Sequence, residues 1–324
     1  MDRLEQIKLP INVEFEVFKR QFSTTLQSDN SLLNEVMNYV KQRSGKMMRP
    51  ILTLLMAKCY GQISPATYHA AISLELLHTA SLIHDDVVDE SNERRGRASV
   101  NALYDNKVAV LVGDYLLATS LKHSALTGKL ALVDLTSTLG QQLSEGEVIQ
   151  LTNTSASDFS ENVYFDVIKK KTAALFSAAA RAGALSVNSS DEIADKAYLF
   201  GELLGIAFQI KDDIFDYSSS SIIGKPTGND MQEGKLTLPA LYVLNTLHDE
   251  SMNQLALKIR ALEASNDEIH SFISWVIANG GIEYASQVMV DYRDKALAIL
   301  SDDLPIVLKQ SLEAYVDFVI ERRK

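Results

Sequence analysis

Two short segments of the chain bring carboxylates close together. Both have the pattern DDxxD: "DDVVD" supplies Asp85, Asp86 and Asp89, and "DDIFD" supplies Asp212, Asp213 and Asp216. On a helix, the first and last aspartate of this pattern are four residues apart and share a face. Like charges at that spacing destabilise a helix, and a bound divalent cation would remove the repulsion. A single DDxxD is most often a solvated helix end, but two copies after similar apolar segments favour two metal-binding clusters.

The type of ligand indicates the type of metal. The two clusters offer only carboxylate oxygens, with no cysteine or histidine at a ligand spacing, so they favour a hard cation such as Mg²⁺. Mg²⁺ keeps several waters when it binds to a protein, and substrate phosphates commonly complete its coordination shell. The clusters therefore predict a phosphorylated substrate.

Basic residues that could bind such a substrate are spread over four segments. They are Lys46 and Arg49 in "GKMMRP", Arg94 and Arg95 in "ERRGR", Lys171 in "KKKTA", and Lys225 and Lys235 in "GKPTGNDMQEGKLTLP". Lys46 and Arg49 are three residues apart, which predicts a shared helix face. Each cation alone is more often a surface residue, but together they suffice for two phosphorylated groups. His78 precedes Asp85 by two helical turns and shares its face; the alternative is an ordinary core histidine.

The bulk composition excludes several classes of protein. The formal net charge is −11, from 31 basic and 42 acidic residues, which argues against a general binder of nucleic acid or anionic membranes. The single cysteine, Cys59, leaves no intrachain disulfide and no cysteine-based zinc site, and we expect a cytoplasmic location. The N-terminus shows no signal-peptide pattern, and we expect no transmembrane segment because no apolar run reaches about 18 residues.

Helices must position these residues. Apolar residues recur at helical spacing before both aspartate clusters, and strand-like alternation is scarce. Breaks between helices are predicted near residues 61–66, 218–230 and 278–281. Since none of them resembles an interdomain linker, we predict an all-α protein with a single large helical bundle domain over residues 1–324. The irregular stretch 218–234 is predicted to be a mobile lid.

Four blocks of the sequence resemble those of the trans-type polyprenyl diphosphate synthases. "LLHTASLIHDDVVDESNERRGRASVN" and "GIAFQIKDDIFDYSSSSIIGKPTGNDMQEGKLTLP" resemble the two aspartate-rich motifs of that family, and "GKMMRP" and "KKKTAALFSAAARAGA" resemble two further blocks. The blocks occur in family order over about residues 45 to 240. The resemblance implies an isoprenoid synthase fold, a homodimer, and Mg²⁺-dependent head-to-tail condensation of isopentenyl diphosphate with an allylic diphosphate.

The resemblance also implies roles for individual residues. Two or three Mg²⁺ ions would be bound by Asp85 and Asp89 on one wall and by Asp212 on the other, with support from Asp213 and Asp216. Isopentenyl diphosphate would be bound by Lys46, Arg49, His78 and Arg95. The allylic diphosphate would be bound by Arg94, Lys171, Thr172, Gln209, Lys225 and Lys235. Met48 stands where the family usually has a basic residue, but Arg49 is retained.

The residue types suit this chemistry. Loss of diphosphate from an allylic substrate leaves a delocalised carbocation, so the enzyme must neutralise the departing charge and exclude water. No serine or cysteine nucleophile is needed, because the alkene of isopentenyl diphosphate attacks the cation. The resemblance implies that the departing diphosphate accepts the proton.

Two small residues bear on the length of the product. Ala80 and Ser81 precede Asp85 by about one helical turn, ~5.4 Å, which is close to one isoprene unit. Short-chain members of the family carry an aromatic side chain near these positions, so the resemblance predicts a long-chain, octaprenyl-like synthase whose product exceeds geranylgeranyl diphosphate. The alternatives are that both residues are small for close helix packing, and that the chain is a short-chain farnesyl or geranylgeranyl synthase.

Three other functions fit part of the pattern. A class I terpene cyclase uses an aspartate-rich motif and Mg²⁺ but needs no second diphosphate site. A di-iron helical bundle calls for Glu-x-x-His pairs, and "ELLH" at 75–78 supplies only one. A non-enzymatic subunit of a heteromeric synthase would be expected to lose motif aspartates, whereas both sets are present here.

Overall fold

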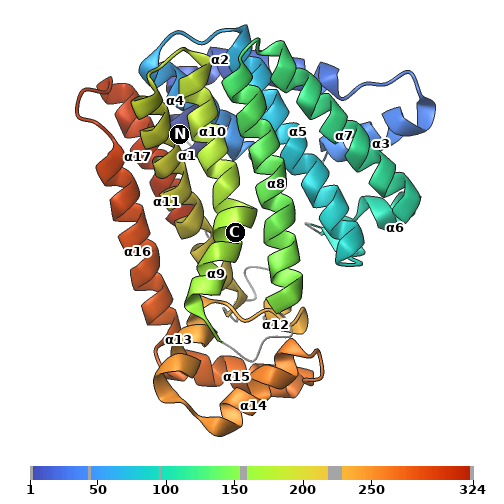
Figure 1. Ribbon diagram of the computed structural model, residues 1–324, viewed down its shortest axis with the longest axis vertical. Coiled ribbons are helices and arrows are strands. Elements are labelled where there is room, and N and C mark those ends of the chain that lie inside the picture. Colours follow the sequence, from blue (N-terminus) through green and yellow to red (C-terminus); the bar gives the residue numbers. More distant parts are fainter. Residues whose placement is uncertain (1–2, 43–44, 95, 154–158, 218–227, 322–324) are drawn as a thin grey trace. The chain divides into compact units, whose positions relative to one another are not determined.

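The described residues form an almost entirely helical protein, which confirms the predicted all-α fold. The computed structural model describes residues 3–42, 45–94, 96–153, 159–217 and 228–321 (Figure 1). No helix within these residues is long and apolar enough to span a membrane. By its internal contacts the chain divides into two compact units that are interleaved in sequence. Unit 1 comprises residues 1–141, 175–201 and 300–315, and unit 2 comprises residues 142–174, 202–299 and 316–324. The single-domain organisation stays a prediction.

Unit 1 holds the N-terminal helices and the first aspartate motif. Its complete elements are α1 (Arg3–Lys8), the 3₁₀-helix η1 (Leu9–Ile11), α2 (Asn12–Thr25), α3 (Ser31–Gln42), α4 (Met48–Tyr60), α5 (Pro65–Val88), the two-residue strands β1 (Glu93–Arg94) and β2 (Arg97–Ala98), α6 (Val100–Tyr104) and α7 (Asn106–Leu126). It also includes parts of α8 (Leu130–Asn153), α10 (Ala174–Ser186), α11 (Asp191–Asp216) and α17 (Ile306–Glu321).

Helices α5 and α7 lie side by side in unit 1 (Figure 1). Ser73 on α5 and Ser120 on α7 each donate a hydrogen bond to the other's backbone carbonyl oxygen, at 2.9 and 2.8 Å. Further along, Gly113 leaves room for the His84 ring, because an added Cβ would lie 2.1 Å from His84 Nε2. This close packing holds the helix that carries the first aspartate motif.

Two of the predicted helix breaks are confirmed. The chain leaves α4 after Tyr60, and α5 then begins with a capping box in which Ser64 and Thr67 bond to each other's backbone, with Pro65 in the first turn. Near the C-terminal end, α15 ends at Ala278 and Gly280 adopts a left-handed φ of 82° before α16 starts. Of the predicted lid, residues 218–227 lie outside the described residues.

The predicted shared helix face of Lys46 and Arg49 is wrong. Helix α4 begins only at Met48, and Met47 before it has a left-handed φ of 51°. Lys46 therefore precedes the helix and is exposed, whereas Arg49 lies in its first turn and is half-buried. The helical spacing rule fails here because the local backbone is not helical.

Unit 2 contains the second aspartate motif. Its elements are the C-terminal part of α8, α9 (Glu161–Ile168), a π-helical turn over Lys169–Ala173, the C-terminal part of α11, α12 (Asn229–Gln232), α13 (Leu238–Leu247), α14 (Glu250–Arg260), α15 (Asn266–Ala278) and α16 (Gly281–Ile299). Its core is a cluster of buried side chains that includes Tyr217, Met231, Leu244 and Phe272. Tyr217 thereby anchors the end of the second aspartate motif in this core.

Candidate active site

The first aspartate motif lies at the C-terminal end of α5. Asp85 is half-buried, and Asp89, which caps the helix, is exposed and donates its backbone N–H to the Asp85 carbonyl oxygen at 2.8 Å. Asp86 points elsewhere: it is buried and accepts a hydrogen bond from Arg94 Nε at 2.5 Å. Arg94 lies in β1 of the short β1–β2 hairpin, opposite Arg97. The structure thus pairs Arg94 with a carboxylate to which the sequence assigned no role.

The second aspartate motif ends α11, and its middle residue is again bound to protein groups. Asp213 is buried and accepts hydrogen bonds from Tyr164 Oη at 2.5 Å and from Gln209 Nε2 at 2.8 Å. Thr172 Oγ1 donates to Gln209 Oε1 at 2.7 Å, which extends the network to the π-helical turn. Thr172, Gln209 and Asp213 are therefore brought together as predicted residues of one site, and Tyr164 joins them.

The outer aspartates of this motif are more accessible. Asp212 and Asp216 are both half-buried. Asp216 accepts hydrogen bonds from the backbone N–H groups of Asn229 and Asp230, at 2.9 and 3.1 Å. These bonds tie the start of α12 to the end of α11.

The electrostatics of unit 2 favour a bound cation. Burial, with further contributions from Asp212 and Asp216, raises the pKa of Asp213 to about 7, although hydrogen bonds from Tyr164 and Gln209 lower it. Burial and neighbouring carboxylates also raise the pKa of Asp230 well above its ordinary value. Carboxylates this crowded are more stable beside a positive charge. Among the described residues, however, no group of three carboxylate, histidine or cysteine side chains is arranged as a metal site.

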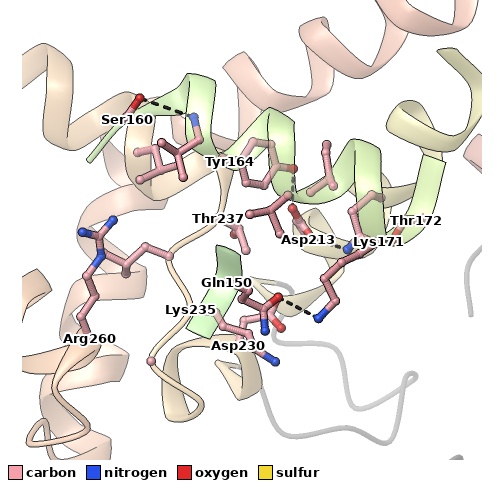
Figure 2. Close-up of a pocket in the computed structure, with 17 residues that line it drawn as sticks. Gln150, Ser160, Tyr164, Lys171, Thr172, Asp213, Asp230, Lys235, Thr237 and Arg260 are labelled. Carbon is pink, nitrogen blue, oxygen red and sulfur yellow. Dashed lines mark hydrogen bonds between the residues drawn. The ribbon is translucent and has the colours of Figure 1, made fainter. Parts of the chain in front are cut away.

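A pocket of about 280 Å³ opens beside this network in unit 2. Figure 2 shows residues from α9, the π-helical turn and the segment after α12 around it. The predicted site residues that line it are Lys171, Thr172, Gln209, Asp213 and Lys235. Lysines and hydroxyl or amide groups beside carboxylates form a surface suited to an anion together with a cation.

The two lysines of the pocket are held by carboxylates. Lys171 Nζ donates to Glu147 Oε2 at 2.5 Å and to Gln150 Oε1 at 2.9 Å. Lys235 Nζ contacts Glu233 Oε2 at 2.6 Å. Each of the two ammonium groups at the pocket is therefore paired with a carboxylate.

The predicted residues of the isopentenyl diphosphate site belong to unit 1. Arg49 places its guanidinium group 5.2 Å from the centre of the Phe176 ring, and His78 is half-buried on α5. Lys46 stands exposed before α4. Arg95 and Lys225, predicted for the two diphosphates, lie outside the described residues.

The two predicted chain-length residues differ in their surroundings. Ala80 is fully buried on α5. Ser81 is half-buried, and its hydroxyl donates to the His78 carbonyl oxygen at 2.9 Å. Their role in setting the length of the product stays a prediction.

The sequence reasoning missed several residues of the pocket. They are Gln150, Tyr164, Asp230 and Arg260, together with Glu147, which pairs with Lys171. Glu147 and Gln150 are three residues apart on α8, a spacing that signals a shared helix face. Nothing in the local sequence, however, connects that face to a lysine of a later element.

Comparison with known proteins identifies the family. A sequence model described as "Polyprenyl synthetase" matches residues 30–276. The chain belongs to the polyprenyl synthetase family. Octaprenyl diphosphate synthase of Escherichia coli is 36% identical over 278 residues, which are 85% of each chain. Heptaprenyl diphosphate synthase component 2 of Geobacillus stearothermophilus is 34% identical over 89% of each chain.

Solved structures of this family share the fold. A decaprenyl diphosphate synthase from Rhodobacter capsulatus has a TM-score of 0.91 at 34% identity, covering 99% of each chain. A geranylgeranyl pyrophosphate synthase from Bacteroides thetaiotaomicron has a TM-score of 0.88 at 51% identity, covering 99% of this chain and 100% of that one.

The family membership distinguishes the polyprenyl synthase interpretation of the sequence from the di-iron bundle. The isoprenoid synthase fold and the resemblance to long-chain polyprenyl synthases are confirmed, and the chain is a prenyltransferase of head-to-tail type. The di-iron bundle is thereby excluded. The residues that bind each substrate and the metal remain predictions.

Proposed function

We propose that this polyprenyl synthetase condenses isopentenyl diphosphate with an allylic diphosphate and extends the product beyond geranylgeranyl length. The pocket of unit 2 carries the proposal. It combines two lysines, Lys171 and Lys235, with the buried Asp213 network of the second aspartate motif, and so offers cations for a diphosphate beside that motif. The names of the octaprenyl and decaprenyl synthases support the long product.

The carboxylates of the two motifs fit Mg²⁺. Asp85 and Asp89 in unit 1 and Asp212 in unit 2 would hold the ions, and Asp216 would assist from its place beside α12. Asp213 supports the site indirectly, because Tyr164 and Gln209 occupy its two oxygens. Bound Mg²⁺ would neutralise charge on the leaving diphosphate. One or two carboxylates completed by substrate oxygens suffice for this ion, so three converging side chains are not required.

The protein's own residues would prepare the reaction in three ways. The allylic diphosphate would be held by Lys171, Thr172, Gln209, Lys235 and Arg94, with Lys225. Isopentenyl diphosphate would be held by Lys46, Arg49 and His78, with Arg95. Apolar helix faces would keep water from the carbocation. The alkene attacks the cation, and the proton then lost would pass to the departing diphosphate.

The length of the product depends on the helix that carries the first motif. A prenyl chain growing from the diphosphate would pass Ala80 and Ser81 one turn before Asp85. Because both side chains are small, it could continue beyond four isoprene units. The synthase from Bacteroides thetaiotaomicron is named for geranylgeranyl pyrophosphate, so product size is the feature that most needs measurement.

A homodimer is part of the proposal. Helix α7 exposes apolar side chains on one stripe, including Leu111, Tyr115 and Leu126, of which Leu111 is 67% exposed. A helix that is apolar on its outer side as well as its inner side is usually covered by another chain. The relative named component 2 supplies the alternative, a heteromeric enzyme. Light scattering of the purified chain should give twice the 35.8 kDa mass of the single chain.

We also propose a cytoplasmic location.

The reaction class is tested with the purified chain alone. We expect labelled isopentenyl diphosphate to enter an extractable prenyl product only when an allylic primer and Mg²⁺ are both present, and a chelator to abolish the transfer. A terpene cyclase would instead convert the allylic substrate without isopentenyl diphosphate, and a non-catalytic subunit would give no product. Either result would contradict the proposal.

A further inference from the structure

Helix α8 approaches the π-helical turn very closely in unit 2. At Gly146 an added Cβ would lie 2.8 Å from Lys171 Cγ and 2.9 Å from Lys170 Cβ. The turn spans Lys169–Ala173, and such π-helical insertions are frequent at functional sites. Only a glycine allows the two backbones to come this close, so the neighbours of Gly146 lie directly against the lysines.

Two glutamates flank Gly146, and each pairs with one lysine. Glu145 contacts Lys170 at 2.8 Å, and its side chain is 61% exposed. Glu147 contacts Lys171 at 2.5 Å, and its side chain is only 15% exposed. The first pair is an ordinary surface ion pair, which contributes little. The second is shielded from water, where a charge-assisted hydrogen bond is stronger.

The geometry around Lys171 limits where its ammonium group can point. An ammonium group has three N–H donors. Glu147 and Gln150 each accept one of them, at 2.5 and 2.9 Å. Lys171 and Gln150 line the pocket, whereas Glu147 is not among the lining residues. Fixing two donors sets the direction of the third.

Stability alone does not account for Glu147. Its second oxygen, Oε1, is buried and has no hydrogen-bond partner among the described residues. A buried carboxylate oxygen without a partner is unfavourable for folding. The strong contact that this position gives Glu147 is the one to Lys171.

We propose that Glu147 is a positioning residue for the allylic diphosphate. It acts through Lys171: together with Gln150 it fixes the ammonium group, so that the remaining N–H is presented to the diphosphate in the pocket. The inference rests on the proposed role of Lys171. It adds a specificity-determining residue on α8, outside the aspartate motifs, and it limits the effect to one of the two substrates.

Binding of inorganic pyrophosphate in the presence of Mg²⁺, measured by calorimetry, tests this without turnover. The chains compared are the wild type, Glu147→Ala, Glu147→Gln, Lys171→Ala and the double variant Glu147→Ala with Lys171→Ala. We expect Glu147→Ala to weaken binding about tenfold, the scale of one charge-assisted hydrogen bond. The double variant should bind no more weakly than Lys171→Ala, because the two residues act as one unit. Glu147→Gln keeps an acceptor for Lys171 and should recover most of the affinity.

Glu145→Ala is the matched control, since it removes the same charge from the same helix beside the neighbouring lysine. It should bind pyrophosphate like the wild type. In steady-state assays, Glu147→Ala should raise KM for the allylic primer and leave KM for isopentenyl diphosphate unchanged. Wild-type affinity in Glu147→Ala, full additivity with Lys171→Ala, or an equal loss in Glu145→Ala would each overturn the inference. If Lys171→Ala itself bound pyrophosphate normally, the assignment of Lys171 in the proposed function would fall, and the inference with it.

Discussion

At the scale of single residues, the two aspartate motifs have the same arrangement of buried and exposed aspartates. In each, the middle aspartate is buried and bound to protein groups: Asp86 to Arg94, and Asp213 to Tyr164 and Gln209. The outer aspartates are more exposed. The outer residues are therefore the better candidates for metal binding, and the middle ones hold the motif in shape.

Removal of an outer aspartate should abolish most activity without unfolding the protein. Asp85→Ala or Asp212→Ala deletes a proposed metal ligand, and loss of one contact to developing charge typically costs about 2.7–4 kcal/mol, or roughly two to three orders of magnitude in kcat. Far-UV circular dichroism should match that of the wild type. Near-normal turnover at saturating Mg²⁺ would show that the metal assignment is wrong.

The Tyr164 hydroxyl should matter for stability. Tyr164→Phe leaves a buried oxygen of Asp213 without its donor, which typically costs about 1–3 kcal/mol. Urea unfolding at neutral pH measures this change. Phe165→Leu, on the same helix but without a hydrogen bond to the motif, serves as the comparison. Equal free energies of unfolding for the wild type and Tyr164→Phe would contradict the proposed support of Asp213.

At the scale of elements, glycines and a pair of histidines lie where helices pack closely. Helix α8 meets the π-helical turn at Gly146, and α7 meets α5 at Gly113. Towards the start of α5, His69 Nδ1 lies 3.0 Å from His123 Nδ1 of α7, and Thr25 Oγ1 of α2 lies 3.3 Å from His123 Nε2. Two imidazoles this close cannot both be charged without repulsion.

The histidine pair should make stability depend on pH. Burial, and then His69 and Lys122, lower the pKa of His123 from 6.5 to about 4. The unfolded chain therefore takes up a proton at a higher pH than the folded one, so this contribution to stability is present above pH 6.5 and is lost as the pH falls towards about 4. His123→Gln should flatten the dependence of Tm on pH in that range. An unchanged pH profile in the variant would count against the assignment.

A Cβ at Gly146 should separate α8 from the lysine turn. Gly146→Ala places a methyl group against Lys170 Cβ and Lys171 Cγ, and overpacking of this kind typically costs about 1–3 kcal/mol. Thermal unfolding measures the loss. Ser144→Ala, at an exposed position two residues earlier on the same helix, is the control. A Tm equal to that of the wild type would mean that a methyl group fits between α8 and the π-helical turn.

The sequence predicted those parts of the site that are local in the chain. Helix spacing predicted that α5 runs up to the first aspartate motif, and the break before Pro65 follows from its capping residues. Partners distant in sequence could not be found this way. Tyr164 precedes Asp213 by 49 residues, and Glu147 reaches Lys171 only because α8 packs on a π-helical turn. Periodicity also failed at Lys46, where the left-handed Met47 ends the helical spacing.

At the scale of the whole molecule, the predicted site residues are distributed over both compact units. The first motif and the predicted isopentenyl diphosphate residues belong to unit 1, and the second motif and the pocket belong to unit 2. Since each unit supplies carboxylates and cations, neither alone holds the complete predicted set. The proposed function assigns metal and diphosphate binding to residues of both units, and the length of the product is its most readily measured consequence.

A bulky residue before the first motif should shorten the product. Ala80→Phe or Ser81→Phe would fill the path one turn, ~5.4 Å, from Asp85 and stop growth near farnesyl or geranylgeranyl size, with the first condensation still running. Ser81 is the safer position because Ala80 is fully buried and a larger side chain there also strains the core. An unaltered chain length in an active Phe variant would show that the product does not pass these residues.

The most direct test is the size of the wild-type product. The purified chain is incubated with labelled isopentenyl diphosphate, farnesyl diphosphate and Mg²⁺, and the dephosphorylated alcohols are separated by thin-layer chromatography against prenyl alcohol standards. We predict a dominant product longer than geranylgeraniol that disappears when the primer or the metal is omitted. A product that ends at geranylgeraniol would contradict the long-chain proposal, and the absence of any elongated alcohol would contradict prenyl transfer by this chain.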